Sequence, residues 1–309
     1  MTVHVRAPVD GATLVVPILR AGVVAMELCK APARAEVAAV FERSFHLRAG
    51  DLFVCIGEPA IGNGPLTLIA EMRAAEVGLR PGQPAVISAS GIAIGAVTFT
   101  YDFCEPWRSP RWRQTPSPDR LAQARDALLL RAAAKAPVEG FGRAVADSNE
   151  RLTAVARIAR QRLARLQSWL ADTIEARNTP AASLPDAVRD LVGLGPGLTP
   201  SGDDALIGAL ALLDALAERH AHASLAQALR QIPAGLTSPL SHCFLHTAAA
   251  GHVGEHLHAA VSSLVGGDAD AAVATIRIIG HSSGWDMMAG AVTALTASVR
   301  RVHAALRGR

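Results

Sequence analysis

The chain has 309 residues, of which half are hydrophobic, and its formal net charge is +3 at pH 7. A chain of this length can form one large domain or two moderate ones with ample core. The charge is too small to argue for nucleic-acid binding, and no charge-free apolar run reaches the ~18 residues of a membrane span. The four cysteines show no paired spacing, as is usual in a reducing compartment. We therefore expect a cytoplasmic protein that binds neither nucleic acid nor membranes.

The N-terminal part of the chain, residues 1–115, has the pattern of a small β-rich domain. Its start, 1–28, is apolar but interrupted by charges and a proline, which favours a strand and a helix over a signal peptide. Short apolar segments bounded by Gly, Pro or Asp predict strands at 51–56, 66–70, 85–90 and 92–100. Helical patterns are expected around 21–30 and 67–77, and the second of these competes with the strand at 66–70.

Residues 116–309 form the second predicted domain, which is larger and mainly helical. Four prolines crowd the segment before it and indicate a linker: Pro106, Pro110, Pro116 and Pro118. Helical patterns then follow at 117–136, 145–173, 203–220, 225–231, 238–264, 269–279 and 286–306. The predicted fold class is therefore α+β, with a small β-rich N-terminal domain followed by a larger mainly helical C-terminal domain.

The most informative segment is the glycine-rich loop GLGPGLTPSGDD at 193–204, which stands directly before a long apolar helix. Two caps are open for this helix: Thr199 with Pro200 at the first helical position, or Ser201 with Asp204 in a capping box. In either case N–H groups and the helix dipole would favour a bound anion. The candidate phosphate-binding residues are Gly195, Gly197, Thr199, Ser201 and Gly202. The alternative is a well-capped helix after a tight turn.

Asp203 and Asp204 come at the start of a helix that is apolar on all sides from residue 205 to residue 213. Such a helix is buried, so it carries the two acids into or near the interior. A buried carboxylate is costly unless it is hydrogen-bonded, paired with a charge or bound to a cation. Capping satisfies one of the two acids, and the other needs a further partner.

A second segment repeats this design, because residues 201–209 align without gaps to residues 283–291. In each segment an Asp precedes a Gly by four residues, so both lie on one helix face. A buried helical glycine allows a second backbone to pack closely, which would bring Asp204 and Asp286 near each other. The loop before the second segment adds polar donors: His281, Ser282 and Ser283. Two facing helix starts would make a pocket for a phosphate-bearing substrate, with Mg²⁺ as the ion that Asp203, Asp204 and Asp286 would hold.

These two loops resemble the AllH-type subunit of oxamate carbamoyltransferase, from anaerobic allantoin breakdown. Further family-like pieces extend the resemblance: Thr237, Ser241, Gly251 and Glu255, the segment around Asn63 and Gly64, and the stretch 107–110. The resemblance implies carbamoyl transfer between oxalurate and phosphate, which yields oxamate and carbamoyl phosphate. It also implies a complex with other carbamoyltransferase subunits.

Roles for the candidate residues follow from the resemblance and from the chemistry of the transfer. Asp203, Asp204 and Asp286 would orient the amide, accept its proton or hold a divalent ion. Thr237 and Ser241 would donate hydroxyl hydrogen bonds. Glu255 would orient an amide or an arginine, or is a helix-surface glutamate. His281 would be a hydrogen-bonding loop residue or a base.

The polar loops contain no arginine to clamp a substrate carboxylate. We therefore expect another subunit, or the segment around Asn63 and Gly64, to complete the pocket. Two other functions stay open. The chain would be a non-catalytic scaffold of such a complex, or a stand-alone enzyme of a related pathway that binds a phosphate ester or acyl phosphate.

Three further patterns have simpler interpretations. Residues 252–256, HVGEH, match a zinc-protease motif, but zinc chemistry would need a further carboxylate ligand, and Gly254 weakens the helix. The tryptophans and arginines of 107–113 indicate a packed linker more than a nucleic-acid site. Five arginines on a long helix predict a solvated face or a subunit contact: Arg151, Arg157, Arg160, Arg162 and Arg165.

Overall fold

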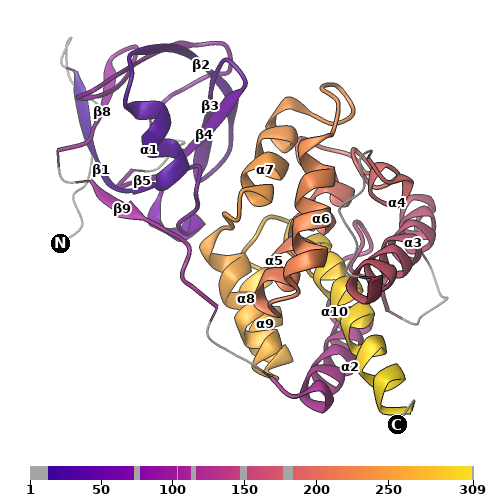
Figure 1. Ribbon diagram of the computed structural model, residues 1–309. Coiled ribbons are helices and arrows are strands. Elements are labelled where there is room, and N and C mark those ends of the chain that lie inside the picture. Colours follow the sequence, from indigo (N-terminus) through magenta and orange to yellow (C-terminus); the bar gives the residue numbers. More distant parts are fainter. Residues whose placement is uncertain are drawn as a thin grey trace. The chain divides into compact units, whose positions relative to one another are not determined.

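The computed structural model describes residues 13–72, 77–102, 104–112, 116–146, 152–176 and 184–307. The chain divides into two compact units, Met1–Ser109 and Pro110–Arg309. The first is built of strands and the second of helices (Figure 1). This confirms the predicted α+β class, in which a small β-rich part precedes a larger mainly helical part.

The first unit is a closed sheet. Its described strands are β1 Leu14–Gly22, β2 Ala33–Val40, β3 Ser44–Ala49, β4 Leu52–Gly57, β5 Thr67–Ala70, β6 Pro84–Ser88, β7 Gly91–Ile94, β8 Val97–Thr100 and β9 Glu105–Trp107. They are ordered β5-β4-β3-β2-β6-β7-β8-β1-β9, and antiparallel pairing of β1 with β5 closes the sheet. The helix α1 Val23–Cys29 and a short 3₁₀ helix, Pro59–Ile61, complete the unit. Alternate residues such as Val16 and Ile18 point inward and are buried.

Two predictions for this unit need correction. The segment 92–100 is not one strand, because Gly95 with φ 57° turns the chain and separates β7 from β8. At 67–70 the strand β5 forms instead of a helix, since these residues pair with both β1 and β4; residues 73–76 of the competing helix lie outside the described residues. The helix expected around 21–30 is confirmed as α1.

The second unit is a helical assembly around a central buried helix. Its described helices are α2 Pro118–Lys135, α3 Ala154–Ala176, α4 Asp186–Arg189, α5 Ser201–Ala215, α6 Arg219–Arg230, α7 Pro239–Ala249, α8 Glu255–Val265, α9 Ala269–Ile276 and α10 Ser283–Arg307. Every residue of α5 except Asp214 is buried, as its apolar sequence predicted. The segment expected as one helix at 238–264 is two helices, because Gly251 adopts φ 87° and ends α7.

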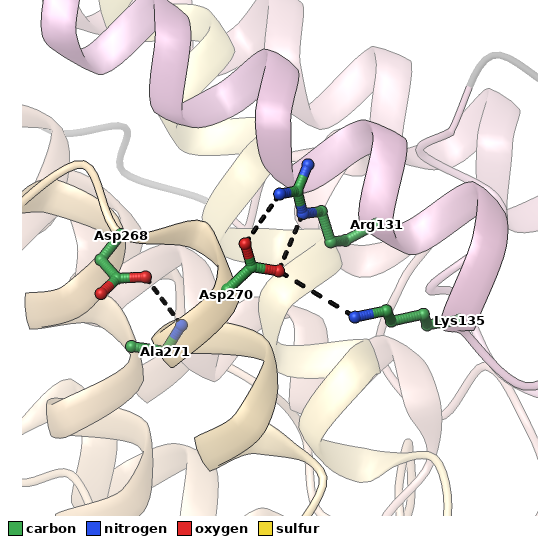
Figure 2. Close-up of polar contacts among 5 residues, drawn as sticks. All are labelled: Arg131, Lys135, Asp268, Asp270 and Ala271. Atoms are coloured by element: carbon green, nitrogen blue, oxygen red, sulfur yellow. Dashed lines mark hydrogen bonds and ion pairs between the residues drawn. The ribbon is translucent and has the colours of Figure 1, made fainter.

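Polar side chains connect the outer helices of this unit to neighbouring segments. Arg131 of α2 makes a two-pronged ion pair with Asp270 of α9, and Lys135 approaches the same carboxylate (Figure 2). On α3, the Arg160 guanidinium donates to the carbonyl oxygens of Ala144 and Ala146. Part of the arginine face predicted to be solvated therefore fixes neighbouring loops instead; Arg151 lies outside the described residues.

The chain entering the second unit packs through Trp112. Its indole Nε1 donates to Asp214 Oδ2 at 2.8 Å, and its ring stacks on His258 with centroids 3.9 Å apart. This favours the packed-linker interpretation of the tryptophans. Within the described part of the chain, none of the helices combines the length and hydropathy needed to cross a membrane.

Candidate functional site

The starts of α5 and α10 lie against each other, as the repeated sequence pattern predicted (Figure 1). A Cβ atom on Gly208 of α5 would collide with the carbonyl oxygen of Met287, and one on Gly290 of α10 would collide with that of Ala205. Met287 and Ala205 are themselves equivalent in the alignment of the two segments. The two helices therefore cross at a reciprocal, glycine-lined contact.

The repeat extends upstream of both helices. Gly202 leaves no room for a Cβ beside the carbonyl oxygen of Leu191, and its N–H donates to Leu194 O at 2.8 Å. The equivalent Gly284 stands in the same way against Ile276 O and donates to Ile279 O at 3.0 Å. The turn that feeds each helix is thus the same, and only the loop between turn and helix differs in length.

Two serines lie close to the carboxylates across the crossing. The hydroxyl of Ser201, the first residue of α5, opposes the rise in the pKa of Asp286 of α10. The hydroxyl of Ser283, the first residue of α10, does the same for Asp204 of α5. Each helix start therefore stabilises the carboxylate of the other, which brings four of the predicted site residues together.

Asp203 is fully buried and both of its oxygens are used within the chain. Its Oδ1 accepts from Gly193 N at 2.9 Å, and its Oδ2 accepts from the hydroxyls of Thr237 and Ser241. Burial raises the pKa of Asp203, and these three donors oppose the rise. The predicted hydroxyl donors are therefore close to an aspartate, but they bind Asp203 and tie the loop at 193 to the start of α7.

Asp286 is also buried and holds a loop that the sequence analysis missed. Its Oδ1 accepts from Phe141 N at 2.5 Å. The preceding Gly140 adopts φ 79° and has no room for a Cβ beside that oxygen. Burial raises the pKa of Asp286, opposed by Phe141 N–H and by the hydroxyls of Ser201 and Ser282. The glycine pair at 140 and 142 was the available sequence signal for this loop.

Asp204 differs from its two neighbours, because one of its oxygens has no partner. It is 2% exposed, and among the described residues no donor reaches Oδ2. Burial raises the pKa of Asp204 well above its ordinary value; the Ser283 hydrogen bond opposes this, while the charges of Asp286 and Asp203 add to it. A buried carboxyl oxygen without a partner is costly, so Asp204 is the acid in this cluster with unused bonding capacity.

Both predicted caps of α5 are wrong. The helix is capped by Pro200, no side chain caps it, and Ser201 is already its first residue. Asp203 N and Asp204 N both donate to Pro200 O, and Gly202 N is used by Leu194 O. Of the residues expected to hold an anion, Gly202 therefore has its N–H committed to a carbonyl oxygen, because the tight turn folds back over the helix start.

Four loops meet at this end of the unit, and we call residues 139–141, 193–200, 236–238 and 280–283 the four-loop cluster. Besides the aspartate contacts, the Ser238 hydroxyl donates to Leu198 O, and His281 Nε2 lies 3.6 Å from Glu139 Oε2. The centre of the cluster is buried, whereas Pro196, Gly197, Leu198 and His281 are exposed. The cluster therefore presents a surface of loop residues above three buried acids.

Two further predicted residues lie in the four-loop cluster, and three lie elsewhere. Within the loop at 193–200, Gly195 adopts φ 115° and packs on Ser201, and Thr199 is partly buried. Glu255 is the first residue of α8 and is partly buried. Asn63 and Gly64 are buried in the first unit, so their part in a pocket stays a prediction.

The donors around the acids bear on whether these side chains could hold Mg²⁺. Asp203 and Asp286 face N–H and O–H donors, which a cation would have to displace. Across the described ranges no group of three or more His, Cys, Asp or Glu side chains is arranged to hold a metal ion. The acids as they stand do not fit Mg²⁺, whose binding there stays a prediction.

The comparisons with known proteins bear on this same region. Residues 191–295 match the family model described as oxamate carbamoyltransferase subunit AllH. The resemblance expected from the loop motifs is thereby confirmed over these residues. The AllH match includes three segments of the four-loop cluster, 193–200, 236–238 and 280–283, and the three buried aspartates. It does not include the loop at 139–141. No curated protein and no solved structure matches the chain.

Proposed function

We propose that this chain is a subunit of a cytoplasmic carbamoyltransferase complex that exchanges a carbamoyl group between oxalurate and phosphate. The observation that carries the proposal is the AllH match at 191–295, which covers both helix starts and all three buried aspartates. Asp204 is kept at a cost in stability, because its buried Oδ2 has no partner among the described residues. Unused bonding capacity at a buried acid is typical of functional sites.

The transfer sets clear requirements for the site. A phosphate oxygen attacks the carbamoyl carbon of oxalurate, the bond from that carbon to the oxamate nitrogen breaks, and that nitrogen gains the proton that hydrogenphosphate loses. Catalysis then depends on aligning two anions and stabilising charge as it moves between them. Loops that are fixed before the substrate arrives supply this alignment at low entropic cost.

The four-loop cluster supports distinct roles for the acids. Asp203 and Asp286 act as positioning residues, because their oxygens hold the backbone of Gly193 and Phe141. Asp204 is the acid with an oxygen left for substrate. The exposed loop residues, with Ser282 and His281, would contact the phosphate and the departing group.

Two anions bound side by side require positive charge, which the cluster itself supplies poorly. Its segments contain no arginine or lysine. The nearby Arg143 donates its Nε to Ala136 O at 2.8 Å. We therefore infer that another subunit supplies the cations, so the active site forms only in the complex.

The test is turnover of oxalurate with phosphate. The chain alone should be nearly inactive, and co-expression with the other carbamoyltransferase subunits should restore activity. In the assembled complex Asp204→Asn should lower kcat at least 100-fold, whereas Asp270→Asn, at the exposed ion pair of Figure 2, should not. A complex that assembles but never forms carbamoyl phosphate would refute the proposal.

The scaffold alternative has one observation in its favour. All three aspartates are at most 2% exposed, as expected if each has a purely structural role. In that case Asp204→Asn would leave the turnover of an assembled complex unchanged. A stand-alone enzyme of a related pathway would be indicated by full activity of the purified chain.

A further inference from the structure

The internal repeat assigns a ligand chemistry to Asp204. Asp204 and Asp286 occupy equivalent positions, four residues before the glycines at which the helices cross. Each has the first serine of the opposite helix as a neighbour, whose hydroxyl favours the charged form of the carboxyl group. In these respects the two carboxyl groups have equivalent surroundings, because exchanging α5 with α10 converts one environment into the other.

The two carboxyl groups differ in their remaining neighbours. The Ser282 hydroxyl opposes the rise in the pKa of Asp286, and its equivalent on the α5 side is Pro200. Asp286 Oδ1 accepts a backbone N–H, from Phe141, at 2.5 Å. The loop that carries Phe141 lies outside the repeated segments, and its Gly140 and Gly142 pack against Asp286 and Trp285 of α10. On the α5 side Asp204 Oδ2 has no donor among the described residues, although it is as deeply buried. The repeat therefore contains two equivalent carboxyl acceptors, and only that of Asp286 receives a backbone N–H from within the described part of the chain.

We propose that Asp204 Oδ2 binds the N–H of an amide-bearing ligand, in the manner in which Asp286 binds the Phe141 amide. This deepens the proposed function and rests on it for the choice of ligand, since oxalurate, oxamate and carbamoyl phosphate each carry an –NH₂ group beside a carbonyl. Asp204 is then the residue that selects an amide over an isosteric group.

Asp204 lies close to the surface of the unit. Its neighbour Ser283 is only partly buried. In the loop before α5, Gly197 is exposed and has φ 99°, with open space around the position of a Cβ. A small planar amide requires little more room than the Phe141 peptide occupies at Asp286.

The experiment compares two ligands that differ only in the group proposed to bind Asp204 Oδ2. Oxamate carries an NH₂ where pyruvate carries a CH₃, and both are measured by titration calorimetry on the complex assembled with the other carbamoyltransferase subunits. A hydrogen bond to a charged group should give a preference for oxamate of about tenfold or more. In Asp204→Asn, which keeps the volume but not the charge, the preference should fall about tenfold. The matched control is Asp214→Asn, at the other end of α5, which should keep it.

The wild-type complex keeps the inference falsifiable if Asp204→Asn does not fold or assemble. ¹⁵N-labelled oxamate should show a downfield shift of its bound N–H protons, and pyruvate should not displace it at equal concentration. Equal affinity for oxamate and pyruvate, binding of neither, or an unchanged preference in folded Asp204→Asn would overturn the assignment. Amide selectivity in a chain whose complex never forms carbamoyl phosphate would refute the proposed function and leave this inference standing.

Discussion

Gly208 packs directly against the backbone of Met287, so α5 and α10 touch main chain to main chain at this point. The same relation holds in reverse between Gly290 and Ala205. Because the aspartates precede these glycines by one turn, the distance between the helices sets the distance between the carboxyl groups. The crossing is thus a structural requirement of the site above it.

Gly208→Ala and Gly290→Ala should each destabilise the helical unit, although alanine is the better helix former by about 1 kcal/mol. The added methyl meets a carbonyl oxygen that cannot move without separating the helices. We expect a loss of about 3 kcal/mol in the free energy of unfolding, the upper end of the usual cost of overpacking a core. The double variant should cost less than the sum, because the first methyl already separates the helices. Urea unfolding measures all three.

The control for this prediction is Gly235→Ala in the same unit. A Cβ there meets open space, but φ is 89°, so only backbone strain is added. Its cost should be about 1–2 kcal/mol. Equal costs for Gly208→Ala and Gly235→Ala would contradict the close crossing.

The sequence predicted those features that depend on a few residues near each other along the chain. The spacing of Asp204 and Gly208, repeated at Asp286 and Gly290, was enough to predict that the helix starts meet. The apolar sequence of α5 was enough to predict its burial. By contrast, β2 and β3 were not predicted, since they carry charges such as Glu36 and Arg48 and are defined by pairing with each other.

The sequence named residues that the structure brings together at the two helix starts, but it did not predict the hydrogen bonds that they form. The cap of α5 was wrong because Leu194 O, reached by a tight turn, takes the Gly202 N–H that a ligand or cap would need. The contact of Asp286 with Phe141 joins residues 145 apart, and sequence spacing carries no information on it. Long-range pairing of this kind depends on tertiary packing.

Asp203 should be a stability determinant of the four-loop cluster. Asp203→Ala leaves the three donors from Gly193, Thr237 and Ser241 without their acceptor, so the free energy of unfolding should fall by about 3 kcal/mol or more. Ser241→Ala removes one donor of three and should cost about 1 kcal/mol. Chemical denaturation distinguishes the two, and equal effects would show that Asp203 is not shared among these donors.

The histidines of the H-x-x-E-H match should not bind zinc. The helix α8 begins at Glu255 with Gly254 as its cap, so His252 precedes the helix and does not share its face with His256. Elemental analysis of the purified chain should find no stoichiometric zinc. We also expect His252→Ala to keep its thermal midpoint in the presence of a chelator. One zinc per chain that disappears in His252→Ala would reverse this conclusion.

The raised pKa of Asp204 predicts a pH dependence of stability with a definite sign. The folded state holds the Asp204 proton more tightly than the unfolded state, whose pKa is near 3.8. The wild-type chain therefore loses stability as pH rises from that value through the folded pKa, by at most about 1.4 kcal/mol per pH unit for this group. Asp204→Asn cannot ionise, so its stability relative to the wild type should increase from pH 4 to pH 8.

The control for the pH prediction titrates in the opposite direction. The Arg131 hydrogen bond lowers the pKa of Asp270, so that residue contributes stability above its unfolded pKa and loses it as pH falls. Asp270→Asn should therefore lose stability relative to the wild type at neutral pH and approach it in acid. Urea unfolding at a series of pH values gives both differences. A flat difference for Asp204→Asn would mean that this carboxyl group is ionised at no cost in the folded chain, and the argument that its burial is retained for function would fail.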